Sequence, residues 1–165
     1  MAIRRFQAAD LGLLHAANQA SVPGVSPETE ADLRKWIDLS ACFVAADAAD
    51  RPLGFLTLIE PGTQAYPSAN LRWFEDYGVR TGRSIIYVDR IALLPEARGQ
   101  RLGEALYEAA FAQFSDRDEI GCEVNIAPPN PGSHRFHQRL GFRRVGDRSD
   151  AAGLKSVAYY VRRLG

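Results

Sequence analysis

The sequence predicts an α/β (α+β) fold, in which a mixed, mostly antiparallel sheet of about seven strands is flanked by about four helices. Two short apolar runs, Cys42–Ala46 and Leu53–Glu60, flank the turn Asp47–Pro52, which is typical of an antiparallel hairpin. Further along, the strand pattern Ser84–Leu94 is followed by a glycine-bearing turn, a helix and the strand pattern Ile120–Ile126. This strand-helix-strand step predicts one parallel pair, because parallel strands need a crossover connection.

The N-terminal part of the chain is predicted to contain one strand followed by two helices. Ile3–Phe6 has the apolar character of a strand, and apolar residues then recur at helical spacing at Leu11, Leu14 and Ala17. We expect the second helix to begin at Ser26-Pro27, since proline fits the first helical position. Its apolar face consists of Leu33, Trp36 and Ile37.

The C-terminal part is predicted to add two helices and two final strands. The first of these helices follows the glycine-bearing turn and carries apolar residues at Leu102, Leu106 and Ala109. The second is a short helix near Ser133–Leu140. The patterns Phe142–Gly146 and Val157–Arg163 then complete the sheet.

Composition indicates one domain, residues 1–165, with 46% hydrophobic residues to form its core. The formal net charge is zero and no basic run is interleaved with aromatics, so we expect no nucleic-acid partner. Met1–Phe6 has two arginines but no apolar stretch behind it, which predicts neither a signal peptide nor a membrane span and hence a cytoplasmic protein. Cys42 and Cys122 lie in apolar runs and are expected in the core; no metal site is expected.

The turn Arg98–Gly103 is the strongest functional signal in the sequence. It lies between a strand and a helix, where free backbone N–H groups and the helix dipole form an anion site. The turn matches neither the Gly-x-Gly-x-x-Gly string of dinucleotide folds nor a P-loop. It therefore predicts a different phosphorylated cofactor.

A second string runs from Asn130 to Phe142 and reads as a capped helix. Asn130 can cap this helix with Pro131 in its first position, while Phe136 and Leu140 lie four apart on one face. Gly141 then ends the helix.

Together the two strings resemble motifs of the GCN5-related N-acetyltransferase (GNAT) superfamily. Arg98 and Gly103 take the first and last places of its acyl-CoA signature, Arg/Gln-x-x-Gly-x-Gly/Ala, while Arg101 stands where a middle glycine is usual. The string that starts at Asn130 is similar to Asn-x-x-Ala/Ser-x-x-Phe/Leu-Tyr-x-x-x-Gly-Phe, with His137 in place of the tyrosine. The order of elements is similar as well, so the resemblance covers nearly the whole chain and implies the GNAT fold.

The resemblance implies an N-acetyltransferase that moves an acetyl group from acetyl-CoA to a primary amine by direct transfer in a ternary complex. The acceptor would be a small-molecule amine, an amino acid or a peptide, and a homodimer is left open because relatives dimerise. The alternative is a non-catalytic acyl-CoA-binding sensor or partner module with the same fold. Arg101 and His137, as departures from the motifs, keep this alternative open.

The chemistry needs a base, because an aliphatic amine with a pKa near ~10.4 is protonated at neutral pH. By resemblance this base lies on one of two strands, where Glu123 is the first candidate and Asp89 the second. Asp89 precedes Arg90, so a structural ion pair is the other reading of that residue. His137 is expected to give a proton to the leaving thiolate.

The resemblance also implies which residues bind the ligands. Those expected to contact acetyl-CoA or coenzyme A are Ile91, Ala92, Leu93, Arg98, Gly99, Gln100, Arg101, Leu102, Gly103, Asn130, Ser133 and Phe136. The segment Pro61–Arg83 is too long for a hairpin connection, and a short helix is expected around Asn70–Tyr77. It is read either as a lid or wall over the acceptor pocket or as a packing element over a sheet edge. Under the first reading the acceptor contacts are Tyr66, Trp73 and Tyr77, together with Tyr87, which alternates onto one strand face with Asp89 and Ile91.

Overall fold

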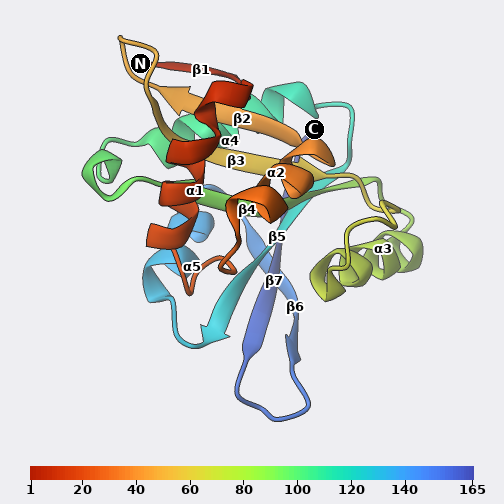
Figure 1. Ribbon diagram of the computed structural model, residues 1–165. Coiled ribbons are helices and arrows are strands. Elements are labelled where there is room, and N and C mark those ends of the chain that lie inside the picture. Colours follow the sequence, from red (N-terminus) through yellow and green to blue (C-terminus); the bar gives the residue numbers. More distant parts are fainter.

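The computed structural model describes residues 1–165 and contains one seven-stranded sheet in the order β1-β2-β3-β4-β5-β7-β6 (Figure 1). The strands are β1 (Ala2–Arg5), β2 (Ala41–Ala46), β3 (Pro52–Ile59), β4 (Ile85–Leu93), β5 (Glu119–Ala127), β6 (Arg143–Ser149) and β7 (Ser156–Arg163). Every neighbouring pair is antiparallel except β4 and β5, which run parallel. The predicted mixed sheet and its single parallel step are confirmed.

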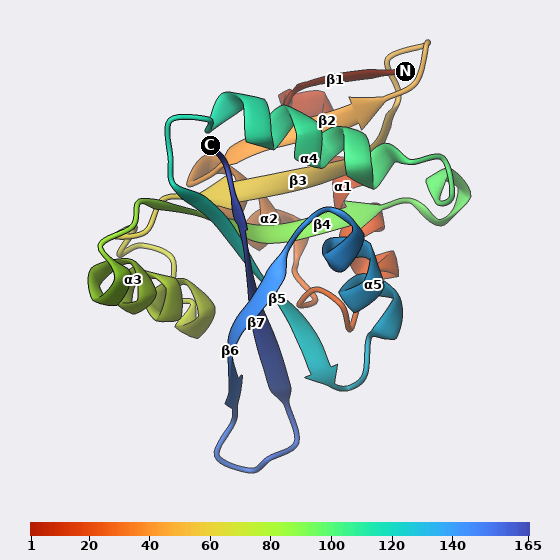
Figure 2. The same cartoon turned by 180° about the vertical axis from the view of Figure 1, so that it is seen from behind.

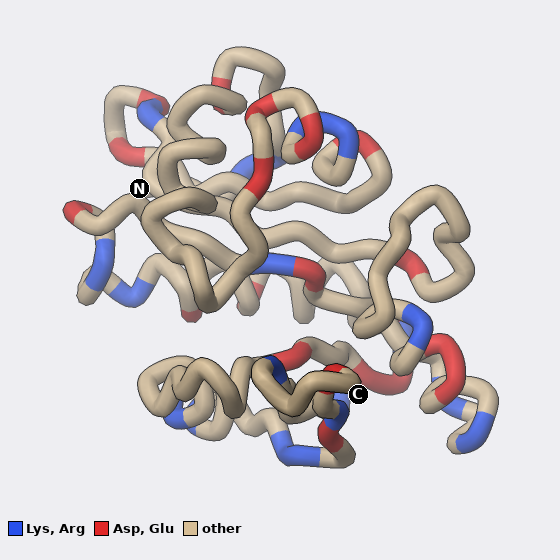
Figure 3. The backbone as a smooth tube through the Cα atoms, turned by 60° about the horizontal axis from the view of Figure 1, so that its bottom comes forward, with Lys and Arg blue, Asp and Glu red and all other residues tan.

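Five α-helices accompany the sheet, where about four were predicted. They are α1 (Leu11–Ala20), α2 (Glu30–Asp38), α3 (Ala69–Thr81), α4 (Leu102–Gln113) and α5 (Pro131–Arg139). Helices α1 and α2 cover one face of the sheet in Figure 1, and α4 covers the opposite face, seen from behind in Figure 2. None of the helices has the length and apolar character needed to span a membrane. Basic and acidic segments are interspersed along the chain (Figure 3).

Two helix boundaries differ from the sequence prediction, and capping explains both. Helix α2 begins at Glu30 instead of Ser26-Pro27, because Thr29 is its N-cap and accepts a hydrogen bond from the Asp32 N–H at 3.1 Å. Helix α3 is longer than expected. Ser68 caps its start by accepting from the Leu71 N–H, and Gly82 ends it with φ +71°.

Helix α3 packs on the sheet through large aromatic side chains. Trp73 stacks on Tyr159 of β7 with ring centroids 3.9 Å apart, and Phe74 lies over Gly121 of β5. A Cβ at Gly121 would collide with Phe74, and one at Gly146 would lie 2.6 Å from Trp73. Most of helix α3 is therefore a packing element, and only its first residues, including Asn70, and the segment that precedes it, including Tyr66, reach the cavities described below.

The parallel strands β4 and β5 are paired over only a short stretch. Strand β4 pairs with β5 only from Ile85 to Tyr87, so the rest of this β4 edge has no neighbouring strand. Against β3, the pairing skips Asp89, which makes it the extra residue of a β-bulge. The bulge interrupts the strict alternation predicted for Tyr87, Asp89 and Ile91, and it lies just after Tyr87, where the pairing of β4 with β5 ends.

Candidate active site

Three connected cavities lie around the opening between β4 and β5. The α5 cavity, of about 380 Å³, lies between the loop after α1, the two diverging strands and the start of α5. The hairpin cavity, of about 280 Å³, adjoins it on the side of α3 and the β6–β7 hairpin. The turn cavity, of about 880 Å³, lies along β4 and the Arg98–Gly103 turn. Asp89, Arg90 and Glu123 are among the residues that line both the α5 and the hairpin cavity.

Glu123 lies at the junction of the α5 and hairpin cavities, on β5. Its carboxyl oxygens accept hydrogen bonds from the Tyr87 hydroxyl at 2.9 and 2.8 Å and from Asn70 Nδ2 at 3.1 Å. Burial, aided by the nearby negative charge of Asp89, raises the pKa of Glu123 to about 8. A carboxylate with this pKa is a stronger proton acceptor than an ordinary glutamate, and it faces both cavities.

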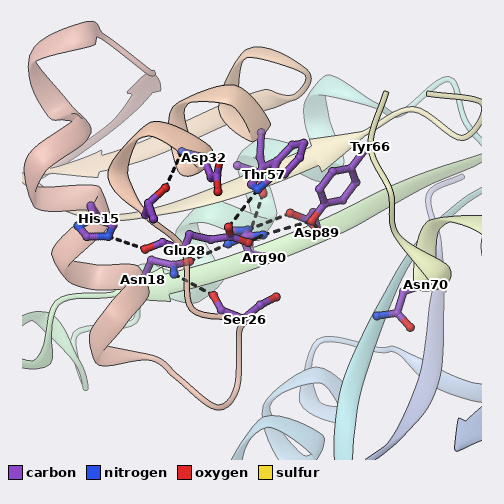
Figure 4. Close-up of polar contacts among 12 residues, drawn as sticks. His15, Asn18, Ser26, Glu28, Asp32, Thr57, Tyr66, Asn70, Asp89 and Arg90 are labelled. Atoms are coloured by element: carbon purple, nitrogen blue, oxygen red, sulfur yellow. Dashed lines mark hydrogen bonds and ion pairs between the residues drawn. The ribbon is translucent and has the colours of Figure 1, made fainter. Parts of the chain in front are cut away.

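Asp89 is held in a structural ion pair, which was the alternative reading of this residue. Its Oδ2 accepts from Arg90 Nε at 2.9 Å and its Oδ1 accepts from the Tyr66 hydroxyl at 2.7 Å (Figure 4). Only 6% of the side chain is exposed. Asp89 is thus paired with a buried guanidinium, whereas the hydrogen-bond donors to Glu123, Tyr87 and Asn70, are neutral.

Arg90 is the centre of a buried polar network that joins α1, α2 and β4 (Figure 4). Its guanidinium also donates to Asn18 Oδ1 at 2.9 Å and to Glu28 Oε1 at 3.2 Å. Glu28 in turn accepts from Trp36 Nε1 at 3.1 Å. The network fixes the loop between α1 and α2 as one wall of the cavities.

His137 lines the α5 and turn cavities but is poorly placed to donate a proton. Its Nδ1 contacts the carbonyl oxygen of Ser133 at 2.8 Å, and its Nε2 contacts the Tyr107 hydroxyl at 2.7 Å. A carbonyl only accepts, so Nδ1 carries the hydrogen and Tyr107 donates to Nε2. Burial lowers the pKa of His137 to about 4. The expected proton donor is thus a neutral ring whose only N–H is bonded to the backbone.

The Arg98–Gly103 turn contains two residues with left-handed backbone conformations. Gly99 has φ +80°, and Arg101 has φ +58° although it is not glycine. The first α4 hydrogen bond runs from the Ala105 N–H to the Arg101 carbonyl at 3.2 Å. The N–H groups of residues 102–104 therefore have no partner within the helix, and they form an anion site at its start.

The turn cavity fits a long polyanionic ligand with an apolar part. Arg98, Arg101 and Arg139 line it, and none of the three forms an ion pair with a carboxylate. The β4 residues Ile91–Leu93 line its other side, along the strand edge that β5 leaves open. These features can hold a pyrophosphate at the turn and an extended amide chain along β4.

The structure brings most of the predicted cofactor contacts together. Asn130 caps α5, accepting from the Ser133 N–H at 3.4 Å, and both residues line the α5 cavity. Phe136 packs beside Gly103, where a Cβ would lie 3.1 Å from its ring. Gln100 lines none of the three cavities, and its side chain donates to the Glu96 carbonyl.

The predicted acceptor contacts divide into two groups. Tyr66 and Tyr87 line the hairpin cavity, whereas Trp73 and Tyr77 do not. The Tyr77 hydroxyl instead donates to the buried Glu119 at 2.9 Å, and Trp73 lies on Tyr159 as described above. Tyr77 is a buried core residue and Trp73 is a half-buried residue that packs against the core, which corrects the expectation that they line an acceptor pocket.

Sequence reasoning missed several residues of the cavities. They are Glu28, Asn70, Tyr107, Arg148 and Lys155. Asn18, the buried acceptor of a hydrogen bond from Arg90, was missed as well. Most come from segments far from the two motifs. In the polar network around the cavities, a local sequence signal existed only for Arg90, which directly follows its ion-pair partner Asp89.

Solved structures share this architecture over the whole chain. A GNAT superfamily phosphinothricin acetyltransferase from Sinorhizobium meliloti, solved with AcCoA, has a TM-score of 0.70 at 20% identity, covering 99% of this chain and 88% of that one. Such a likeness shows the fold. The sequence profile described as the acetyltransferase (GNAT) family matches residues 12–142, and the chain belongs to this family.

Two curated relatives match parts of the chain. An N-acetyltransferase of Streptomyces griseus is 38% identical over 76 residues, which is 43% of this chain and 39% of the relative. A phosphinothricin N-acetyltransferase of Streptomyces coelicolor is 35% identical over 79 residues, which is 45% of this chain and 46% of the relative. The matched parts span less than half the length of either relative.

Proposed function

We propose that the protein is an N-acetyltransferase that moves an acetyl group from acetyl-CoA directly to a primary amine, with Glu123 as the base. The observation that carries this proposal is the position of Glu123. A carboxyl group with a pKa raised to about 8 lies where the α5 and hairpin cavities meet, in reach of ligands from both sides.

The residues around the turn cavity suit acetyl-CoA. The N–H groups at the start of α4, with Arg98, Arg101 and Arg139, would hold its phosphates. The open edge of β4 at Ile91–Leu93 would hydrogen-bond its extended amide chain. When bound, acetyl-CoA supplies the reactive thioester, and β4 backbone N–H groups can polarise the carbonyl of that thioester.

Glu123 would take the proton that the amine must lose before it attacks. An aliphatic ammonium has a pKa near ~10.4, and an ordinary glutamate is about six units weaker as a base. The raised pKa of Glu123 closes more than half of that gap. Tyr87 and Asn70 hold the carboxyl group in one orientation, which favours proton transfer along a fixed line.

One observation favours the second candidate, an acyl-CoA-binding sensor without turnover. Both nitrogens of His137 are bonded within the protein, so no side chain identified from the motifs donates a proton to the leaving thiolate. Such a protein would bind acetyl-CoA and release no coenzyme A.

Two measurements separate these functions. The first is the melting temperature with excess acetyl-CoA, and with ATP and NAD as controls. At ~100 times its dissociation constant, a ligand adds about 2.7 kcal/mol, which raises the melting temperature of such a domain by several degrees. The second is release of free thiol from acetyl-CoA with a panel of primary amines.

An enzyme gives both the shift and amine-dependent thiol release. A shift without thiol release for any amine indicates the sensor. The absence of any shift with acetyl-CoA contradicts both functions.

A further inference from the structure

Two cations at the mouth of the hairpin cavity have no carboxylate partner. Arg148 of β6 donates to the Tyr159 hydroxyl at 3.1 Å and to Asn70 Oδ1 at 3.3 Å, and both acceptors are neutral. Lys155, in the loop before β7, forms no ion pair. By contrast Arg144, on the same strand as Arg148, pairs with Asp147 at 3.0 Å.

The opposite wall of the hairpin cavity carries excess negative charge. Glu28 and Asp89 both pair with the single guanidinium of Arg90, whose side chain is 2% exposed. Two carboxylates on one cation leave about one negative charge on this wall. The cavity is therefore bipolar, negative toward α1 and α2 and positive toward the β6–β7 hairpin.

The positive wall lies close to the proposed base. Asn70 donates through Nδ2 to Glu123 at 3.1 Å and accepts through Oδ1 from Arg148 at 3.3 Å. Arg148 and Glu123 are thus separated by the width of one amide group. A ligand whose nitrogen faces Glu123 can place a second group against Arg148 only if that group is a few bonds away from the nitrogen.

We infer that the acceptor is an amino acid or a close analogue, with a carboxylate or similar anionic group a few bonds from the amine. This inference rests on the proposed function and names its substrate class. The anionic group binds Arg148 and Lys155, and the nitrogen faces Glu123. A polyamine has no anionic group to bind Arg148 and Lys155, so we expect it to be a poorer acceptor.

The transfer on this acceptor balances as follows. The ammonium gives one proton to the Glu123 carboxylate and becomes a neutral amine. Its nitrogen lone pair forms the N–C bond to the acetyl carbon while the C–S bond breaks and its electrons stay on sulfur. The nitrogen then gives a second proton to the leaving thiolate, and Glu123 returns its proton to solvent.

The test measures thiol release with matched acceptors: a series of free amino acids, their α-carboxamides, their decarboxylated amines, and spermidine. We expect kcat/KM for the best amino acid to exceed that of its carboxamide by about tenfold or more, since a hydrogen bond to a charged group is worth that much.

The variants Arg148→Gln and Lys155→Gln are measured beside the control Arg144→Gln. We expect each of the first two to raise KM for the amino acid about tenfold, and to leave KM for the carboxamide and the acetyl-CoA melting shift unchanged. Arg144→Gln changes neither KM, because Arg144 lines a different cavity.

Two results overturn the inference and leave the proposed function intact. One is equal kcat/KM for amino acids and their carboxamides, or a preference for spermidine. The other is an unchanged amino-acid KM in both variants. If no acceptor yields thiol while acetyl-CoA still raises the melting temperature, the proposed function itself fails, and the inference fails with it.

Discussion

The turn cavity and the hairpin cavity are built in different ways. The turn cavity is formed largely by two nearly consecutive stretches of chain, Ile91–Leu93 and the turn before α4, and it is closed on one side by α5. The hairpin cavity is formed by side chains from distant segments, such as Glu28, Asn70 and Arg148. This difference predicts that the turn cavity tolerates a changed side chain, whereas the hairpin cavity depends on each side chain and on its hydrogen-bond partner.

Glu123→Gln tests this contrast where we expect the largest effect. Loss of the base should lower kcat by a factor of about 10²–10⁴ and leave the acetyl-CoA melting shift unchanged. In the wild type, kcat/KM should rise with pH until Glu123 ionises near 8, and the variant should lack this step. A variant with wild-type kcat would remove Glu123 from the mechanism.

The same residue links stability to pH. The pKa of Glu123 is raised from 4.5 to about 8 in the folded protein, so between these values the folded state holds a proton that the unfolded state has released. Stability from this group is complete below the lower value and falls as pH rises toward 8. Melting temperatures from pH 5 to 9 should therefore decline more in the wild type than in Glu123→Gln.

Arg90→Met should cause the largest loss of stability on the hairpin side. Removing the guanidinium leaves Asp89 and Glu28 without their cation, which costs about 3–5 kcal/mol. The matched control is Arg34→Met, because Arg34 forms an exposed pair with Asp38 whose loss costs about 0–1 kcal/mol. Similar urea midpoints for the two variants would show that the network is dispensable.

His137→Phe tests whether the turn cavity depends on a single side chain. Phenylalanine fills similar space but leaves the buried Tyr107 hydroxyl without its acceptor, which costs about 1–3 kcal/mol. Adding Tyr107→Phe should restore part of this loss, and kcat should change little. A fall in kcat beyond a hundredfold with unchanged stability would make His137 the proton donor.

Arg101→Gly should have the smallest effect on folding. Glycine relieves a left-handed strain of roughly 1 kcal/mol but adds freedom to the unfolded chain, so the net change should stay within about 1 kcal/mol. Affinity for acetyl-CoA should fall modestly, and less so at high salt, because one cation is lost.

The control Arg101→Gln removes the charge and keeps the strained backbone. If both variants bind acetyl-CoA as tightly as the wild type, Arg101 does not contact the phosphates.

The sequence allowed the order of elements and the turn to be predicted, because both are encoded in contiguous residues. Apolar runs mark the strands, and the turn and the Asn130 cap are local signals. The predicted start of helix α2 was wrong, because the cap is Thr29, whose side chain accepts a hydrogen bond from the Asp32 N–H, and not Ser26. Residues 26–28 instead belong to the loop between α1 and α2. Asn18 donates a hydrogen bond to the Ser26 carbonyl, and Arg90 donates one to Glu28.

Most of the hairpin cavity could not be predicted, because its contacts cross long stretches of chain. Asn70 and Glu123 are 53 residues apart, and no local pattern links them. The β-bulge at Asp89 could not be predicted from the sequence either, since it appears only in the register of β4 against β3. Trp73 and Tyr77 look like ligand contacts in the sequence, but Gly121 and Gly146 leave room for α3 aromatics on the sheet.

The outermost place of β6 in the sheet has an evolutionary consequence. This strand pairs only with β7, and the hairpin that joins them projects away from the rest of the sheet (Figure 1). Its outer part, from Arg148 to Lys155, can lengthen or exchange charges without disturbing the strands that open beside the turn. Descendants of such a protein could acquire new acceptors by revising this one hairpin while inheriting the donor side unchanged.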